Sequence, residues 1–312
     1  MILEKMALDT QLKDENLIVA VYMITYNQEK YIEQAIESII NQKTNFKFKL
    51  FVGEDCSTDN TKEICLKLAE KYLKKIHLVT NDHNIGASQN AKNIFDLCFN
   101  SGTKYIALIE GDDYWTDPHK LQKQVDFLEN NPDYSICFHN VEEVDSSGKI
   151  LEKRLVVSDP NEKTYTIEDL SNGNFIHTAS VLFRKSFDEL PSWFFTSPAG
   201  DYPLHIMNAS YGLIKYFPEK MAAYRIGQGV WSSQTKQVQF VNTIFVIKLM
   251  MANLNLSNQV IKNFDNQISR LLLHLKDVVS PNIPQQSPEN IAYNLSLKKL
   301  VIILLKKIRY SF

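Results

Sequence analysis

Three carboxylates stand close together near the middle of the chain. Glu110, Asp112 and Asp113 directly follow residues 105–109, an apolar run that predicts a buried strand. Open α/β sheets bind ligands at the carboxyl ends of their strands, and carboxylates packed there repel one another unless a cation or hydrogen-bond donors neutralise them. The segment therefore predicts a site for Mn²⁺ or Mg²⁺, completed by substrate phosphates. A solvated acidic turn before a helix that starts near Pro118 explains the same residues and stays open.

Strand and helix patterns alternate over residues 17–140. Apolar residues spaced three and four apart predict a helix between successive strands. We expect Asn27 to cap the first helix, and Asn60 with Glu63 to form a capping box at the second. This alternation predicts an α/β fold with a mainly parallel sheet and helices on both faces. The apolar runs that predict the strands are 17–24, 48–52, 76–79, 105–109 and 134–140.

The pattern is looser after residue 141. A turn is predicted at 145–148, a strand at 178–184, a helix at 201–211 and two further strands at 214–217 and 221–226. Beyond residue 233 the spacing is typical of long helices, interrupted by a proline-rich linker at 280–288.

The bulk composition excludes several classes of protein. A formal net charge of −2, from 34 basic and 36 acidic residues, is not typical of nucleic-acid binding. The four cysteines form no CxxC pair, which favours reduced thiols and a cytoplasmic location over a disulfide or zinc framework. We find no signal-peptide pattern at the amino terminus and no apolar run of membrane-spanning length.

Four polar loops should meet at one edge of the predicted sheet. They cover residues 25–29, 54–59, 81–86 and 110–113, and two of them are strongly acidic. An edge this acidic would repel a bare phosphate, so it favours a metal ion paired with a nucleotide. The chain has neither GxGxxG after its first strand nor GxxxxGK[ST] anywhere, which argues against a Rossmann oxidoreductase and a P-loop NTPase.

Four motifs in order carry a resemblance to a known family. VAVYMITYN at 19–27, EDCSTDNT at 54–61, NIG at 84–86 and EGDDYW at 110–115 resemble the signature series of the family 2 glycosyltransferases. The match is good over 17–140 and looser over 141–232. It implies a GT-A fold, a nucleotide-sugar donor and inversion at the anomeric carbon.

The resemblance also implies roles for single residues. Thr25, Tyr26 and Glu29 match the loop around the base and ribose, and Asp55 matches the aspartate that accepts a hydrogen bond from uracil or thymine. This favours a UDP or dTDP donor. In the DxD-type motif, which begins with Glu110 here, Asp112 and Asp113 are expected to bind the metal, and Asp112 also the donor.

Later positions carry further expectations from the resemblance, and some keep an alternative. Arg225, in a loop with Gly227 and Gly229, is expected to contact the diphosphate. Asp59 either caps a helix or contacts the ligand. Trp115 either lines the donor pocket or belongs to the edge of the core.

Asp201 resembles the family's catalytic base, a carboxylate at the start of a helix below the acceptor. The chemistry needs such a group because the acceptor hydroxyl loses its proton as it attacks the anomeric carbon. A plain helix cap explains the same residue type and position. Asp188 and Glu189 are the nearest rivals for the role of base.

The expected organisation is a GT-A catalytic domain at 1–232 and a helical extension at 233–312. Within the domain, 17–140 would bind the nucleotide sugar and 141–232 the acceptor, a glycan or a lipid-linked sugar. Residues 297–309 place a short apolar stretch between lysines. This pattern favours a helix packed on the protein or on a second copy over a helix lying on the inner face of a membrane, which it also suits.

Two other functions stay open at this point. A sugar nucleotidyltransferase would use the same metal on a similar sheet, but it needs a glycine-rich phosphate loop where this chain has Tyr26, Asn27 and Gln28. A domain that binds a nucleotide sugar or a partner without turnover would need the same binding loops and no base.

Overall fold

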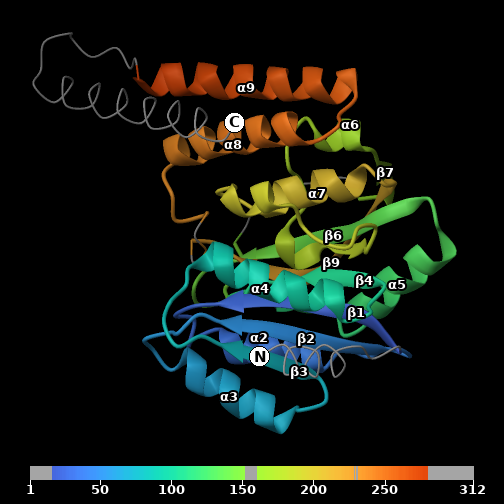
Figure 1. The fold of residues 1–312 in the computed structure, drawn as a ribbon, viewed down its shortest axis with the longest axis vertical. Helices are drawn as coiled ribbons and strands as arrows, with labels where there is room; N and C mark the ends of the chain where they lie inside the picture. The colour runs from blue at the N-terminus through green and yellow to red at the C-terminus, as the bar shows by residue number, and fades with distance from the viewer. Residues whose placement is uncertain (1–15, 152–159, 228, 230, 280–312) are drawn as a thin grey trace, which may run out of the picture.

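The computed structural model describes residues 16–151, 160–227, 229 and 231–279. Its described strands form one mixed sheet in the order β3-β2-β1-β4-β8-β6-β9-β5, with β7 also paired to β9 (Figure 1). The strands are β1 (Leu17–Thr25), β2 (Lys47–Glu54), β3 (Ile76–Thr80), β4 (Tyr105–Leu108), β5 (Tyr114–Trp115), β6 (Tyr134–Val144), β7 (Lys163–Tyr165), β8 (Leu182–Arg184) and β9 (Leu213–Arg225).

The first half of the sheet is parallel, as predicted. Strands β3, β2, β1 and β4 lie side by side in the same direction. Helices α2 (Ile32–Ile40), α3 (Thr61–Lys71) and α4 (Ala87–Asn100) connect them. The central strand β1 is apolar on both faces because helices cover both, so Val19 and Val21 pack in one core while Ala20 and Tyr22 pack in the other. All four loops that follow these strands therefore meet at one edge.

The two strands predicted at 214–217 and 221–226 are one strand in the structure, so that prediction was wrong. Strand β9 pairs with β6 in parallel over most of its length, and it bulges where Phe217 pairs with His139 but Lys220 pairs with Asn140. Pro218 and Glu219 fall in this bulge, which explains why the polar break in the sequence does not end the strand.

Three local predictions also fail. The segment 178–184 is a short 3₁₀ turn (Thr178–Ser180) followed by β8. Asn27 does not cap the first helix, which begins at Ile32, five residues later, with Tyr31 at the cap position. Asn60 precedes α3 but caps it with no side-chain hydrogen bond. Both asparagines instead bond between loops, where a local capping pattern cannot detect them.

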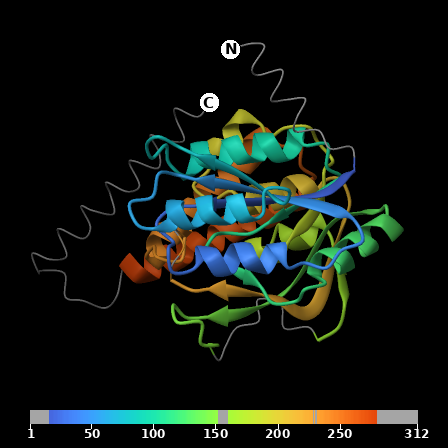
Figure 2. The same ribbon diagram turned by 90° about the horizontal axis from the view of Figure 1, so that it is seen from below.

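Helices cover both faces of the sheet (Figure 2). One face packs on α2, α3 and α5 (Lys120–Asn130), and the other on α4 and α7 (Asp201–Ala209). The short α6 (Ile167–Leu170) and the long α8 (Lys236–Asn253) and α9 (Asn258–Val279) add to the second core. The predicted long helices beyond residue 233 are thereby confirmed up to Val279.

The predicted linker and the lysine-flanked segment at 297–309 lie outside the described residues. Among the residues that are described, no helix combines the length and the apolar character needed to cross a bilayer.

Candidate functional site

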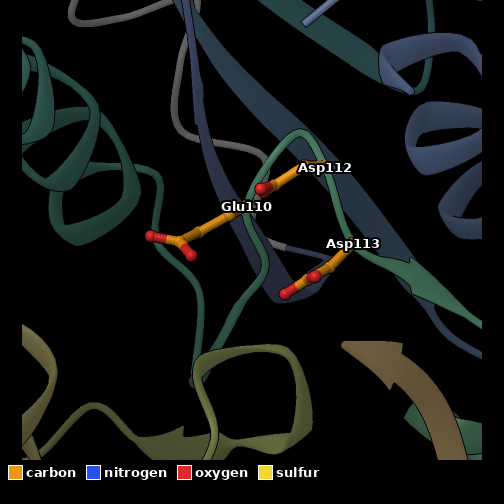
Figure 3. Close-up of side chains that lie close together, drawn as sticks. All are labelled: Glu110, Asp112 and Asp113. Carbon is orange, nitrogen blue, oxygen red and sulfur yellow. The ribbon is translucent and has the colours of Figure 1, made fainter. Parts of the chain in front are cut away.

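The three predicted carboxylates project from the loop that follows β4 (Figure 3). One oxygen from each of Glu110, Asp112 and Asp113 lies within 4.8 Å of the others. Gly111 lets this loop pack against the loop after β1, since an added Cβ would lie 2.4 Å from Gln28 Oε1 and 2.8 Å from the Thr25 hydroxyl. The carboxylate loop and the first loop are therefore in direct contact, and Thr25 lies at that contact.

The surroundings disfavour three negative charges in this loop. Burial, together with the charges of Asp112 and Asp201, raises the pKa of Glu110 to about 8. Burial, together with the charges of Asp112 and Glu110, raises the pKa of Asp113 well above its ordinary value. Burial also raises the pKa of Asp112, although the positive charge of Arg225 opposes this. A bound divalent cation would offset both the cost of burying these charges and the repulsion between them.

One carboxylate oxygen of Asp113 lacks a hydrogen-bond partner in the described residues, and this bears on whether the loop fits a metal ion. Its Oδ1 accepts a hydrogen bond of 2.8 Å from the backbone N–H of Arg225. Its Oδ2 is buried and has no hydrogen-bond partner within the described part of the chain. A buried carboxylate oxygen without a donor is costly, and three carboxylates supply the hard oxygen ligands that Mg²⁺ and Mn²⁺ prefer. The residues present therefore fit such an ion.

Arg225, at the end of β9, is buried and hydrogen-bonds to the carboxylate loop. Its Nε donates to the carbonyl of Asp112 at 2.9 Å, and its Nη1 donates to the carbonyl of Asp145 at 2.9 Å. The guanidinium lies over the ring of Tyr31, 4.3 Å from its centroid, and the residue is 3% exposed. Its observed contacts are thus with the protein, and the expected contact with a diphosphate stays a prediction.

The loops after β1 and β2 are joined by reciprocal hydrogen bonds. The backbone N–H of Glu29 donates to Asp59, and that of Asn60 donates to the carboxylate of Glu29. The backbone N–H of Thr58 donates to Asn27 Oδ1 at 2.8 Å. Asp59 also accepts from the N–H of Thr61, the first residue of α3, which agrees with a capping role, whereas a contact of Asp59 with the ligand stays a prediction.

Asp55 organises the third loop. Its carboxylate accepts hydrogen bonds from Asn81 Nδ2 and from the backbone N–H groups of Ile85 and Gly86, at 2.9–3.0 Å. A carboxylate can accept about four hydrogen bonds, so these three fix its orientation and leave capacity for one more donor. Tyr26, in the neighbouring first loop, is 43% exposed and presents a large ring at the surface.

Asp201 is the first residue of α7, as expected of the candidate base. Its carboxylate accepts a 2.7 Å hydrogen bond from Asn174 Nδ2. Burial raises the pKa of Asp201, and its charge in turn contributes to the raised pKa of Glu110, so the two carboxylates lie near each other. The rivals Asp188 and Glu189 are both exposed, and the side chain of Asp188 is fully so.

Sequence reasoning missed two residues beside Asp201. Asn174 lies in the loop after α6, where no motif marks it, and His205 lies one helical turn after Asp201, a spacing that would have signalled it. The ring of His177 lies against that of Tyr224, tilted by 47° with the ring centroids 4.8 Å apart. Trp115 is buried and donates from Nε1 to the carbonyl of Ala179, so it belongs to the core, one of its two expected positions.

Comparison with known proteins gives the fold and the family. Two solved structures share the GT-A fold with this chain. S. aureus TarS in complex with UDP-GlcNAc has a TM-score of 0.57 and 17% identity, covering 82% of this chain and 71% of that one. The mannosyltransferase PcManGT from Pyrobaculum calidifontis, in complex with GDP-Man and Mn²⁺, has a TM-score of 0.56 and 11% identity, covering 96% and 88%.

One relative and one family model match this chain in sequence more strongly than these two structures do. An uncharacterized protein of Mycobacterium tuberculosis (strain ATCC 25618 / H37Rv) is 34% identical over 218 residues, which cover 69% of this chain and 61% of that protein. The chain thus spans less than two thirds of that relative's length. A model described as Glycosyl transferase family 2 matches residues 20–190 of the 312. Because this match covers more than half of the chain and includes both acidic loops, the protein belongs to glycosyl transferase family 2.

Proposed function

We propose that the protein transfers a sugar from a nucleoside-diphosphate sugar to a hydroxyl of a glycan or lipid-linked acceptor. The reaction is a metal-dependent single displacement that inverts the anomeric carbon. One observation carries the proposal: a buried oxygen of Asp113 has no partner in the described structure, beside Glu110 and Asp112, whose pKa values are raised. Such a cluster is costly for the protein alone and suits a metal ion bound to a diphosphate.

Asp112 and Asp113 are the residues that would hold Mn²⁺ or Mg²⁺, with Asp112 also next to the donor. When bound, the ion would offset the charge on the leaving nucleoside diphosphate. Arg225 contributes by fixing both aspartates, through its bond to the Asp112 carbonyl and its backbone bond to Asp113. Its positive charge lies close enough to lower the pKa of Asp112 and so favours the ionised ligand.

Asp201 is proposed as the general base. The acceptor oxygen forms a bond to the anomeric carbon, the bond from that carbon to the diphosphate oxygen breaks with its electron pair, and Asp201 takes the acceptor proton. Its position supports this role because the carboxylate lies near Glu110, at the edge where the donor loops meet. A raised pKa strengthens a carboxylate as a base, provided that it is ionised at the working pH.

The donor is proposed to lie over the loops of residues 17–140, with the acceptor against residues 141–232. Thr25, Tyr26 and Glu29 would surround the base and ribose, and Asp55 would accept a hydrogen bond from the base. The fixed orientation of Asp55 and its spare acceptor capacity support this. A hydrogen-bond acceptor there favours a UDP or dTDP donor, and the two solved structures hold UDP-GlcNAc and GDP-Man.

Donor hydrolysis tests the proposal without knowledge of the acceptor, since water can replace it. Wild-type protein and Asp201→Asn are incubated with Mn²⁺ and a panel of UDP, dTDP and GDP sugars, and released nucleoside diphosphate is measured. Wild type should hydrolyse at least one donor, and Asp201→Asn should be slower by roughly a hundredfold or more. Equal rates would remove Asp201 as the base, and no hydrolysis of any donor would favour a binding domain without turnover.

A further inference from the structure

A polar pair lies behind the proposed base. Asn174 donates to the carboxylate of Asp201 at 2.7 Å, and His205 Nδ1 lies 3.3 Å from Asn174 Oδ1. We propose that Asn174, held in turn by His205, is a positioning residue that fixes the Asp201 carboxylate for proton transfer. The inference rests on the proposed function of Asp201 and adds two residues to its machinery.

The orientation of the Asn174 amide follows from its neighbours. The backbone N–H of Ile176 donates to one end of the amide at 3.2 Å, so that end must be the oxygen. The other end is therefore the NH₂ group, and it points at Asp201. A reversed amide would set two donors against each other at Ile176 and two acceptors against each other at Asp201. Asn174 can only donate to the base.

The same argument fixes the protonation of His205. Because Asn174 presents an oxygen to it, Nδ1 must carry the hydrogen and donate. Burial lowers the pKa of His205 to about 3, so the ring is neutral and Nε2 carries no proton; Nε2 is buried and has no hydrogen-bond partner in the described residues. His205 and Asp201 lie one turn apart on α7, so the helix fixes the positions of both side chains relative to each other.

Asn174 is a neutral side-chain donor to Asp201, in surroundings where several other groups disfavour a charge on that carboxylate. Glu110 from the loop after β4, Tyr224 from β9 and Tyr202 from the same helix all interact with that charge, and each has its own pKa raised by it. The neighbouring imidazoles of His177 and His205 are neutral, because burial lowers the pKa of both. Hydrogen bonds from the backbone N–H groups of Tyr202 and Asp201, and then the bond from the Asn174 side chain, oppose the effect of burial and lower the pKa of Asp201.

The first test measures the bond without any donor. Protein labelled with ¹³C at the aspartate carboxyl carbons is titrated by NMR in Mg²⁺, and the Asp201 signal is identified by its loss in Asp201→Asn. In Asn174→Ala the titration midpoint of Asp201 should rise by roughly half a pH unit or more, because the charged form loses a donor. Asn172→Ala is the matched control: it removes an asparagine of the same loop that bonds to carbonyls of α6 instead. An equal midpoint in wild type and Asn174→Ala would overturn the inference and leave the proposed transferase function standing.

The second test is a double-mutant cycle on donor hydrolysis, using the best substrate from the panel above. Asn174→Ala should slow turnover about tenfold or more while the donor KM stays within twofold. Combined with Asp201→Asn, it should cause no further loss, since Asn174 acts through Asp201. Additive losses would show a merely structural role and overturn the inference. Thermal unfolding of each variant checks that the fold is intact.

Discussion

The loops after β1 and β2 differ from the loop after β4 in how far their carboxylates are hydrogen-bonded within the protein. In the first pair, Glu29 and Asp59 each accept hydrogen bonds from backbone N–H groups of the structure. In the loop after β4, Asp113 keeps a buried oxygen without a partner in the described chain, and the pKa values of all three carboxylates are raised. Glu54, at the end of β2, also keeps one buried oxygen without a partner in the described residues, so the difference lies between two clusters: Glu29 and Asp59 are paired within the protein, and the three carboxylates after β4 are not fully paired.

This difference separates scaffold from ligand site. A carboxylate that is paired within the protein contributes to stability, whereas one left buried and unpaired costs stability until something binds it. The paired carboxylate of Asp59 holds the loops after β1 and β2, the scaffold loops, together, and the carboxylate loop after β4 supplies the ligands for a metal ion. Substitution of Asp59 should therefore change mainly stability, and substitution in the carboxylate loop should change mainly metal binding.

The largest effect is expected from the metal ligands. Asp113→Asn and Asp112→Asn should each lower Mn²⁺-dependent donor hydrolysis by roughly a hundredfold to a thousandfold, because the leaving diphosphate loses charge compensation. Asp117→Asn is the control, since this nearby aspartate pairs with Lys123 on the surface. Steady-state hydrolysis rates of wild type and the three variants are measured at several Mn²⁺ concentrations. Equal losses in the control and the ligand variants would contradict the assignment.

Glu110 should make stability depend on pH. Its pKa is raised from 4.5 to about 8, so in the metal-free protein the folded state holds this proton more tightly than the unfolded state. As pH rises from about 4.5 to 8, wild type should lose on the order of 2–4 kcal/mol of unfolding free energy relative to Glu110→Gln. Urea unfolding of both proteins in EDTA at pH 5, 6.5 and 8 measures this. Parallel pH profiles would show that Glu110 is not held protonated.

Gly111 joins the two regions, and filling its space should disturb both. In Gly111→Ala the new Cβ meets Gln28 and Thr25, which should cost about 1–3 kcal/mol of stability and weaken donor binding. Gly229→Ala is the control for stability, because a Cβ there meets only an ordinary contact at 3.6 Å. Urea unfolding and nucleotide-sugar titration report the two effects. A Gly111→Ala protein with unchanged stability and affinity would mean that the loops do not touch.

The smallest effect is expected in the scaffold loops. Asp59→Ala removes the acceptor for the N–H groups of Glu29 and Thr61, and should lower stability by about 1–2 kcal/mol. Its Mn²⁺ affinity should equal that of wild type, as measured by calorimetry. If Asp59→Ala bound Mn²⁺ more weakly without losing stability, Asp59 would act in metal binding and the distinction between the two regions would be wrong.

The sequence predicts what local patterns determine. Strands β1, β2 and β4 are apolar on both faces, so their positions and the convergence of their loops follow from the sequence. The carboxylate cluster follows from its place after β4. The continuity of β9 does not, because a bulge at Pro218 resembles a chain break.

Contacts between distant segments leave no local signal. Arg225 reaches Asp112 across 113 positions, and Asn174 reaches Asp201 across 27. Asn60 precedes a helix, as a cap would, yet its side chain bonds to Glu29 in another loop. Such pairings depend on the tertiary fold. A role predicted for Arg225 or Asn60 from their sequence neighbours alone therefore misses the distant residue to which each one bonds.

Calorimetric titration of metal-free protein tests the central claim most directly. UDP, dTDP and GDP sugars are titrated with and without Mn²⁺ into wild type and Asp113→Asn. If the carboxylate loop is a metal site, Mn²⁺ should raise the affinity of wild type for at least one donor by tenfold or more, at roughly 1.4 kcal/mol per factor of ten, and should not do so in Asp113→Asn. No Mn²⁺-dependent gain with any donor, or the same gain in Asp113→Asn, would contradict the account.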